Sequence, residues 1–128
     1  MNVMANFKDL VGKVLINIER SGEYGEEILI FICDDGSKYK MYHEEDCSES
    51  VHIEDINGDL KDLINSEILV ADEKINVEED SDGTSTWTFY TIRTQKGSVD
   101  IRWFGSSNGY YSENVDFIKA DKNGNYEY

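Results

Sequence analysis

Short runs of alternating apolar and polar residues dominate the first half of the chain. Residues 13–19 alternate in this way, residues 28–33 form a continuous apolar run, and residues 38–42 follow a turn signal of two aspartates and a glycine. A period of two is typical of β-strands with one buried face. We therefore expect three strands here, with a loop over residues 21–26. Residues 50–56 alternate again, which predicts a half-buried strand with its acidic side chains facing outward.

Aromatic residues are concentrated in the second half of the chain. Residues 85–94, 98–104 and 110–120 each have the composition and alternation of a strand. The turn residues between them predict a three-stranded meander, with a longer connection at residues 105–109. Residues 78–84 are acidic, contain glycine and lack apolar anchors, so we expect a mobile loop there.

Two short segments have helical spacing instead. Residues 1–12 place apolar side chains at helical intervals before a glycine, and residues 59–65 begin with Asp59, which can cap a helix. Residues 68–71 and 75–77 then resume an extended pattern. The expected fold is mainly β, and α+β only weakly. It is an antiparallel sheet, sandwich or partly open barrel of about seven to eight strands with one or two short helices, in a single domain of 128 residues.

The negative charge of the chain is concentrated in one stretch. Between Glu44 and Asp82 there are fifteen Asp and Glu residues against Lys61 and Lys74, and the formal net charge of the whole chain is −15. Such a surface repels phosphate backbones, so we expect no direct nucleic-acid binding. Complementary charge instead favours a protein partner with a basic surface.

The remaining composition indicates a cytoplasmic protein. No apolar run has the length of a membrane span, and the first ten residues lack the basic start and apolar core of a secretory signal. Two cysteines are too few for a disulfide framework. Because phosphate-binding loops and nucleophile motifs are also missing, we expect no cofactor and no enzymatic activity. The pattern predicts no particular oligomeric state.

Three residues form a candidate metal site. His43, Cys47 and His52 lie four and five positions apart among carboxylates, and imidazole with thiolate can bind Zn or Ni. The spacing lacks the paired ligands of established zinc sites, so the alternative is a solvated acidic loop beside two ordinary histidines. A nucleophilic Cys47 with His43 as its base is disfavoured, because nearby carboxylates oppose thiolate formation.

Two groups of residues are predicted to bind a partner. The acidic group consists of Glu44, Glu45, Asp46, Glu49, Glu54 and Asp55. The second group surrounds the connection at residues 105–109 and consists of Trp103, Asn108, Tyr110 and Tyr111. Aromatic side chains beside small polar residues suit protein contacts. The alternative is that glycine and asparagine only shape the turn while the aromatic rings fill the core.

Four stretches of the chain carry a resemblance. They are residues 39–51 (YKMYHEEDCSESV), 53–56 (IEDI), 101–103 (IRW) and 107–112 (SNGYYS). With their connecting segments they resemble a family of small acidic proteins of bacteriophages and prophages, of unknown function, over residues 13–117. Members of that family tend to carry cysteine in place of Ser48 and glycine in place of Asn65, so a paired-thiol role is not expected for this chain. The resemblance implies a phage context and location in a bacterial host cell.

These observations lead to one expected function and two alternatives. The leading hypothesis is a noncatalytic phage protein that binds and inhibits or modulates a host protein, such as a nucleic-acid-handling or defence component. Its carboxylates would imitate an array of phosphates, as a DNA mimic does. The first alternative is a small metal- or ligand-binding domain or hydrolase centred on His43, Cys47 and His52. The second is an acidic accessory domain whose charge merely keeps it monomeric.

Overall fold

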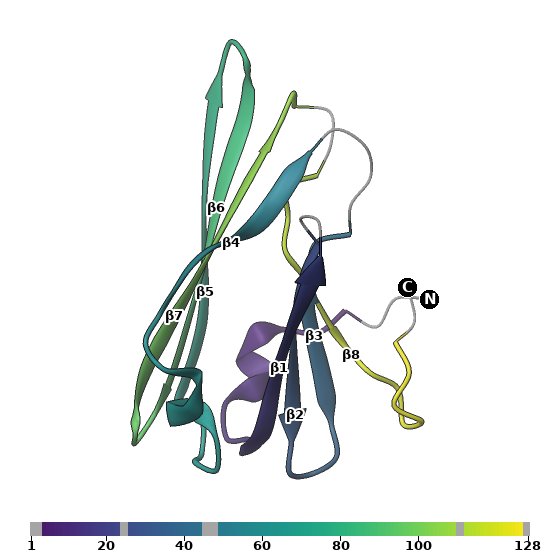
Figure 1. The fold of residues 1–128 in the computed structure, drawn as a ribbon, viewed down its shortest axis with the longest axis vertical. Coiled ribbons are helices and arrows are strands. Elements are labelled where there is room, and N and C mark those ends of the chain that lie inside the picture. The colour runs from purple at the N-terminus through teal and green to yellow at the C-terminus, as the bar shows by residue number, and fades with distance from the viewer. Residues whose placement is uncertain (1–3, 24–25, 45–48, 110–111, 127–128) are drawn as a thin grey trace.

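The strands of this protein form two antiparallel sheets that face each other. The structure is a computed structural model that describes residues 4–23, 26–44, 49–109 and 112–126. Within these residues there are eight strands and two turns of 3-10 helix. The two sheets have four strands each and do not close into a barrel (Figure 1). The predicted mainly β, antiparallel fold is therefore confirmed.

The first sheet has the strand order β1-β2-β3-β8. Its strands are β1 (Leu15–Glu23), β2 (Glu26–Cys33), β3 (Lys38–Tyr42) and β8 (Asp116–Lys119). The prediction of a loop over residues 21–26 is wrong, because β1 and β2 continue in register until Glu23 pairs with Glu26. The side chains there are polar, but the backbone hydrogen bonds of a hairpin do not require apolar side chains.

The second sheet has the strand order β4-β7-β6-β5. Its strands are β4 (Ser50–Asn57), β7 (Gly97–Ser107), β6 (Gly83–Thr94) and β5 (Val70–Asp80). The predicted mobile loop over residues 78–84 is wrong, because β5 and β6 form a continuous hairpin around a two-residue turn. Gly83 has a φ of +148°, and a Cβ there would lie 2.2 Å from the carbonyl oxygen of Ser107. The close approach of β7 therefore explains why glycine begins β6.

The third strand of the predicted meander belongs to the other sheet. β6 and β7 pair as expected, but β8 pairs with β3, and β4 takes the place beside β7. Phe117 in β8 packs its ring against three other core aromatics. The ring centroids lie 5.3 Å from Phe7, 6.2 Å from Phe31 and 5.3 Å from Tyr39. This packing stabilises the crossover of the chain from one sheet to the other.

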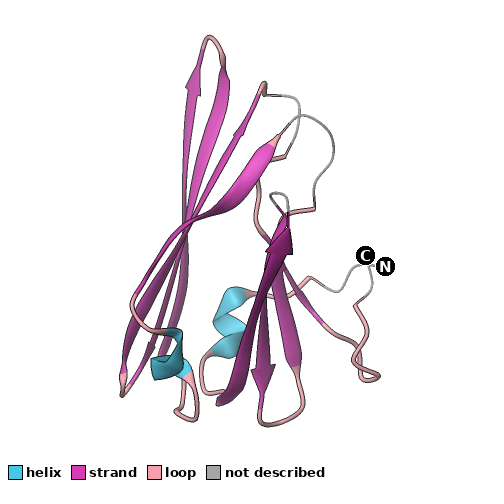
Figure 2. Ribbon diagram, in the orientation of Figure 1, coloured by secondary structure: helices cyan, strands magenta, loops and turns pink. Residues whose placement is uncertain are grey.

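Both predicted helices are single 3-10 turns. The first, η1 (Phe7–Leu10), is capped by Asn6, and the second, η2 (Leu60–Leu63), is capped by Asp59, whose side chain accepts a hydrogen bond from the Lys61 amide. Asn65 follows η2 with a φ of 60°, a left-handed conformation that glycine and asparagine adopt most readily. This agrees with the glycine expected there from the resemblance. Figure 2 shows both turns in the lower half of the molecule.

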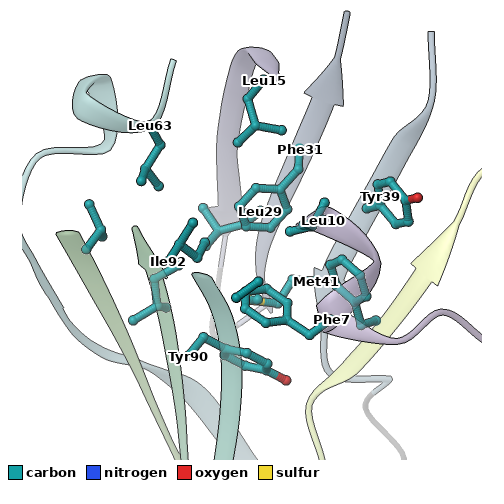
Figure 3. Packing of buried hydrophobic residues seen from close by; sticks show 14 of the residues in the cluster. Phe7, Leu10, Leu15, Leu29, Phe31, Tyr39, Met41, Leu63, Tyr90 and Ile92 are labelled. Atoms are coloured by element: carbon teal, nitrogen blue, oxygen red, sulfur yellow. The ribbon is translucent and has the colours of Figure 1, made fainter. Parts of the chain in front are cut away.

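The space between the sheets is filled by one cluster of apolar side chains. Phe7 and Leu10 of η1 enter it between strands of both sheets (Figure 3). Leu29, Tyr90 and Ile92 are fully buried in the same cluster. In the described part of the chain, no helix has the length and apolar character needed to cross a membrane.

Candidate partner-binding surface

The acidic stretch of the chain supplies both edges of the second sheet. It runs through β4, η2 and β5, and in the strand order β4-β7-β6-β5 the first and last strands are the edges. From Asp72 to Asp80 every side chain of β5 is exposed. The carboxylates therefore lie on either side of the two central strands, β6 and β7.

A bulge in β4 turns two neighbouring acids outward. The register with β7 shifts between Ile53 and Asp55, so that Glu54 and Asp55 are both exposed although strand neighbours normally face opposite ways. Glu54 lies with Oε2 3.1 Å from Nε2 of His52. Asp55 lies with Oδ2 4.0 Å from Nη2 of Arg102 on β7. The predicted partner-binding residues Glu54 and Asp55 thus lie on the solvent side of the sheet.

Three aromatic side chains form the centre of this outward face. Trp87 and Phe89 on β6 and Phe104 on β7 are all half-buried and point away from the core. The Trp87 ring lies 4.5 Å from Phe104 and 6.4 Å from Phe89, the latter with nearly parallel planes at 16°. His52 extends the group from β4, with its ring 6.1 Å from Phe104. We call Trp87, Phe89 and Phe104 the outer aromatic cluster.

A cation already lies against this cluster. The guanidinium of Arg102 is 5.5 Å from the Trp87 ring centroid, a distance at which a cation is attracted to the face of the ring. Beside it is a hollow of about 270 Å³ lined by Asp55, Asn57, Phe89, Thr91, Asp100 and Arg102. Asp100 is held there by a hydrogen bond of 2.8 Å from the Thr91 hydroxyl. The outward face therefore combines apolar rings with fixed carboxylates.

The other predicted partner-binding residues are distributed differently. Trp103 is 1% exposed and directs its indole N–H to the sulfur of Met41 in the core. Asn108 is exposed just after β7, and Glu44 is exposed after β3. Five further predicted site residues lie outside the described residues: Glu45, Asp46, Cys47, Tyr110 and Tyr111.

Glu49 is buried rather than presented to solvent. Its side chain is 0% exposed, and Oε1 lies 3.7 Å from Nε2 of His43, whose side chain is 6% exposed. The other ring nitrogen of His43 lies 2.7 Å from the carbonyl oxygen of Asn114. Because a carbonyl only accepts, Nδ1 of His43 must carry a proton. Glu49 and His43 therefore form a buried polar pair in the described residues between β3 and β4.

The two histidines of the predicted metal site have separate surroundings. His43 is buried beside Glu49, whereas His52 lies on the outward face beside Glu54 and Phe104. The hydrogen bond to Asn114 also occupies Nδ1 of His43. Among the described residues there is no group of three or more potential metal-ligating side chains.

Most of the chain matches a known protein family. A family described as a domain of unknown function, DUF7448, matches residues 8–117. The chain belongs to this family. Neither the curated proteins nor the solved structures that were searched contain a match. The matched region extends from η1 into β8 and includes both edges of the second sheet and the outer aromatic cluster.

The structure also reveals a buried carboxylate that the sequence pattern did not indicate. Glu113 is 6% exposed and accepts hydrogen bonds from the hydroxyls of Thr86, at 2.7 Å, and Ser107. Gly105 allows it to approach, since a Cβ there would lie 3.0 Å from Cβ of Glu113. The two hydroxyl donors give both carboxyl oxygens a hydrogen-bond partner, as buried polar groups usually have. Glu113 is buried because residues 112–116 cross from one sheet to the other, and no local pattern in the sequence indicates this crossing.

Proposed function

We propose that this protein is a noncatalytic binding module for a partner protein with a basic surface. The contact surface is the outward face of β4, β6 and β7. One observation carries the proposal: the outer aromatic cluster is bordered by carboxylates on both edge strands. Glu54 and Asp55 lie on β4. On β5, Asp72 and Glu78 lie on either side of Lys74 and Asn76, which pair with Phe89 and Trp87. Interfaces of this kind derive most of their affinity from a few central aromatic or Arg anchors.

The contacts of Arg102, a cation of the protein's own on this face, support the choice of a basic partner. Its guanidinium lies 5.5 Å from the Trp87 ring and 4.0 Å from Asp55, so one side chain uses both the aromatic and the acidic part of the surface. Lys or Arg side chains of a partner can bind Phe89 and Asp100 in the same way. The surplus of carboxylates also accelerates the encounter with a basic partner.

The resemblance to phage proteins suggests what such a partner does. We propose a bacterial host protein that handles nucleic acid or takes part in defence, and that is inhibited or modulated when the carboxylates occupy its phosphate-binding surface. The acids on the two edge strands supply the array of negative charge for this mimicry. Binding of this kind weakens as salt screens the charges.

The test is capture of a partner by the tagged full-length protein from a bacterial lysate at low and high salt, followed by mass spectrometry. Trp87→Ala should weaken binding of the captured protein by about tenfold or more, as expected for a hot-spot residue. Ile16→Ala is the matched control, because Ile16 is 51% exposed on the first sheet. A basic protein that is lost with Trp87→Ala but retained with Ile16→Ala supports the proposal. Capture that survives molar salt and Trp87→Ala contradicts it.

One observation keeps a second function in view. Nε2 of His43 is buried and has no hydrogen-bond partner among the described residues, which suits a ligand-binding imidazole. A metal- or ligand-binding domain or hydrolase is therefore the alternative. Of the predicted residues His43, Cys47 and His52, it would use His43, since His52 lies in separate surroundings on the outward face. Stoichiometric Zn or Ni after purification without a His-tag, abolished by His43→Ala, would favour it. A stable metal-free protein would dismiss it.

A further inference from the structure

The outermost strand of the second sheet has an unpaired edge. β5 pairs with β6 over eleven residues, from Val70 to Asp80, without a bulge. In the described part of the chain, no strand pairs with its other side. Figure 1 shows the end of this hairpin extending beyond the rest of the sandwich. A long, regular edge of this kind can template an additional strand.

Only the beginning of this edge is covered. η1 packs beside the start of β5, where Nζ of Lys8 lies 3.9 Å from Asp72. Beyond that point the side chains are exposed, including Ile75 at 49% and Val77 at 57%. Two solvated β-branched residues on one side of an edge strand indicate a surface that a further strand can cover.

The hairpin geometry determines which backbone groups are available. The residues that flank a two-residue turn form a hydrogen-bonded pair, here Asp80 with Gly83. By the alternation of an antiparallel ladder, Glu73, Ile75, Val77 and Glu79 direct their N–H and C=O groups toward the free edge. The same four residues share the inward side of the strand, because the register places them opposite Tyr90, Thr88, Thr86 and Thr84.

The charge on the edge excludes a second copy of the chain. β5 carries the carboxylates of Asp72, Glu73, Glu78, Glu79 and Asp80 against the single ammonium of Lys74. Pairing two such strands would bring like charges together across the new ladder, which is destabilising. A strand that carries Lys or Arg would instead place opposite charges across the new ladder, which is stabilising. The charge on β5 therefore disfavours pairing with the β5 strand of a second copy and favours pairing with a basic segment.

We propose that the edge of β5 from Glu73 to Asp80 binds an extended basic segment of the partner as a fifth strand of the sheet. This inference rests on the proposed function for the basic character of the partner. The order acid, apolar, apolar, acid at Glu73, Ile75, Val77 and Glu79 is the same in both directions. Parallel and antiparallel addition therefore require the same segment, with cations at its first and seventh positions and apolar residues at its third and fifth.

The test uses a heptapeptide of the sequence Lys-Thr-Val-Thr-Val-Thr-Lys, acetylated and amidated, titrated into the ¹⁵N-labelled full-length protein. Binding should shift the amide signals of residues 73–79 and slow the exchange of those that face the edge. There are two control peptides of unchanged charge. The first is N-methylated at its odd-numbered positions, and the second at its even-numbered positions. One of them should bind about tenfold more weakly, because it lacks the N–H groups that face β5. Equal binding of all three peptides would show attraction by charge alone and overturn the inference.

Variants of the protein test the same edge from its own side. Val77→Pro removes an edge-facing N–H that the β5–β6 ladder does not use, whereas Val77→Thr keeps it. The first should weaken peptide binding by about tenfold, and the second by less than about threefold. Ile75→Lys is a second variant that introduces like charge toward the peptide without altering the backbone. If Val77→Pro does not fold, loss of binding with Ile75→Lys supports the inference and unchanged binding contradicts it.

The outcomes separate this inference from the proposed function. Ile16→Ala should leave heptapeptide binding within about twofold, because Ile16 lies on β1 of the other sheet. Capture of a basic protein that needs Trp87, together with no peptide shifts on β5, would overturn the edge inference alone. Peptide binding at β5 without any captured basic protein would overturn the proposed function alone. A homodimer that Val77→Pro dissociates would show that a second copy occupies the edge.

Discussion

The two faces of β6 and β7 carry the same kinds of residue but have different roles. On the inward face, Tyr90 and Trp103 are at most 1% exposed and pack in the core between the sheets. On the outward face, Trp87 and Phe104 pack against each other, at 4.5 Å, and remain half-exposed. Trp103 and Phe104 are neighbours in sequence. Aromatic content therefore does not separate core from surface here, whereas the parity of the position along the strand does.

The two faces also differ in the surroundings of their charged side chains. Inward, the buried carboxylate of Glu113 is matched by hydroxyl donors. Outward, Arg102 and Asp55 lie 4.0 Å apart and are half-exposed, so water screens much of their attraction. Substitutions on the inward face should therefore change mainly the free energy of unfolding, and substitutions on the outward face should change mainly binding.

The largest expected effect separates the two tryptophans. Trp103→Ala should lower the free energy of unfolding by about 3–5 kcal/mol, because it leaves a cavity in the core. Trp87→Ala should lower it by about 1 kcal/mol, the contribution of a lost aromatic pair. Urea unfolding followed by circular dichroism measures both. Equal losses would show that the outward face is a second core, and the assignment of Trp87 to binding would fail.

A smaller effect is expected from the buried carboxylate. Glu113→Leu should lower the free energy of unfolding by about 1–3 kcal/mol, because the Thr86 hydroxyl at 2.7 Å loses its acceptor in a buried place. Adding Thr86→Val should recover part of this loss, since the buried donor is then removed as well. Chemical denaturation of both single variants and the double variant gives the coupling free energy. Strict additivity would argue against the hydrogen bond as the cause.

The smallest effect at neutral pH is expected at Tyr90. Burial raises the pKa of the Tyr90 hydroxyl, and the nearby Glu73 carboxylate raises it further. Above pH 10 the unfolded chain releases this proton and the folded chain keeps it, so stability falls as the pH rises. Tyr90→Phe should therefore change stability by less than about 1 kcal/mol at pH 7. Above pH 10 it should remove a decline of about 1.4 kcal/mol per pH unit.

Thermal and urea unfolding of the wild type and of Tyr90→Phe between pH 8 and 11.5 measures this difference. Tyr39, whose pKa is also raised by burial, remains in both proteins and serves as the internal reference. Parallel pH profiles of the two proteins would mean that Tyr90 ionises in the folded state as readily as in the unfolded chain.

Local signals in the sequence were sufficient for the strands with regular alternation. β3 and β4 begin and end within one residue of the predicted ranges, and Asp59 caps its helical turn as expected. The loop predicted at residues 78–84 was wrong because β5 is an exposed edge strand. Residues 78–80 at its end are all acidic, so no apolar alternation continues past Val77, and the extended structure there depends on backbone pairing with β6.

The candidate site was predictable only in part. The acids of β4 were expected to face outward, and a bulge places both Glu54 and Asp55 there. Glu49 belongs to the same acidic run, but it is enclosed beside His43 because the chain enters the second sheet at that point. The sequence contained no signal for this burial, since residues with the same charge lie on either side of it.

Three properties could be predicted from the sequence: the mainly β fold, the positions of the regular strands and the strongly acidic character of one stretch. These properties follow from period-two patterning, capping and composition, which act within a few residues. The pairing of β8 with β3 and the position of the acidic stretch at both edges of one sheet follow only from long-range packing. The same packing also places Trp87, Phe89 and Phe104 on the outward face. Strand order depends on contacts between residues far apart in the chain, and no local pattern encodes which two edges will meet.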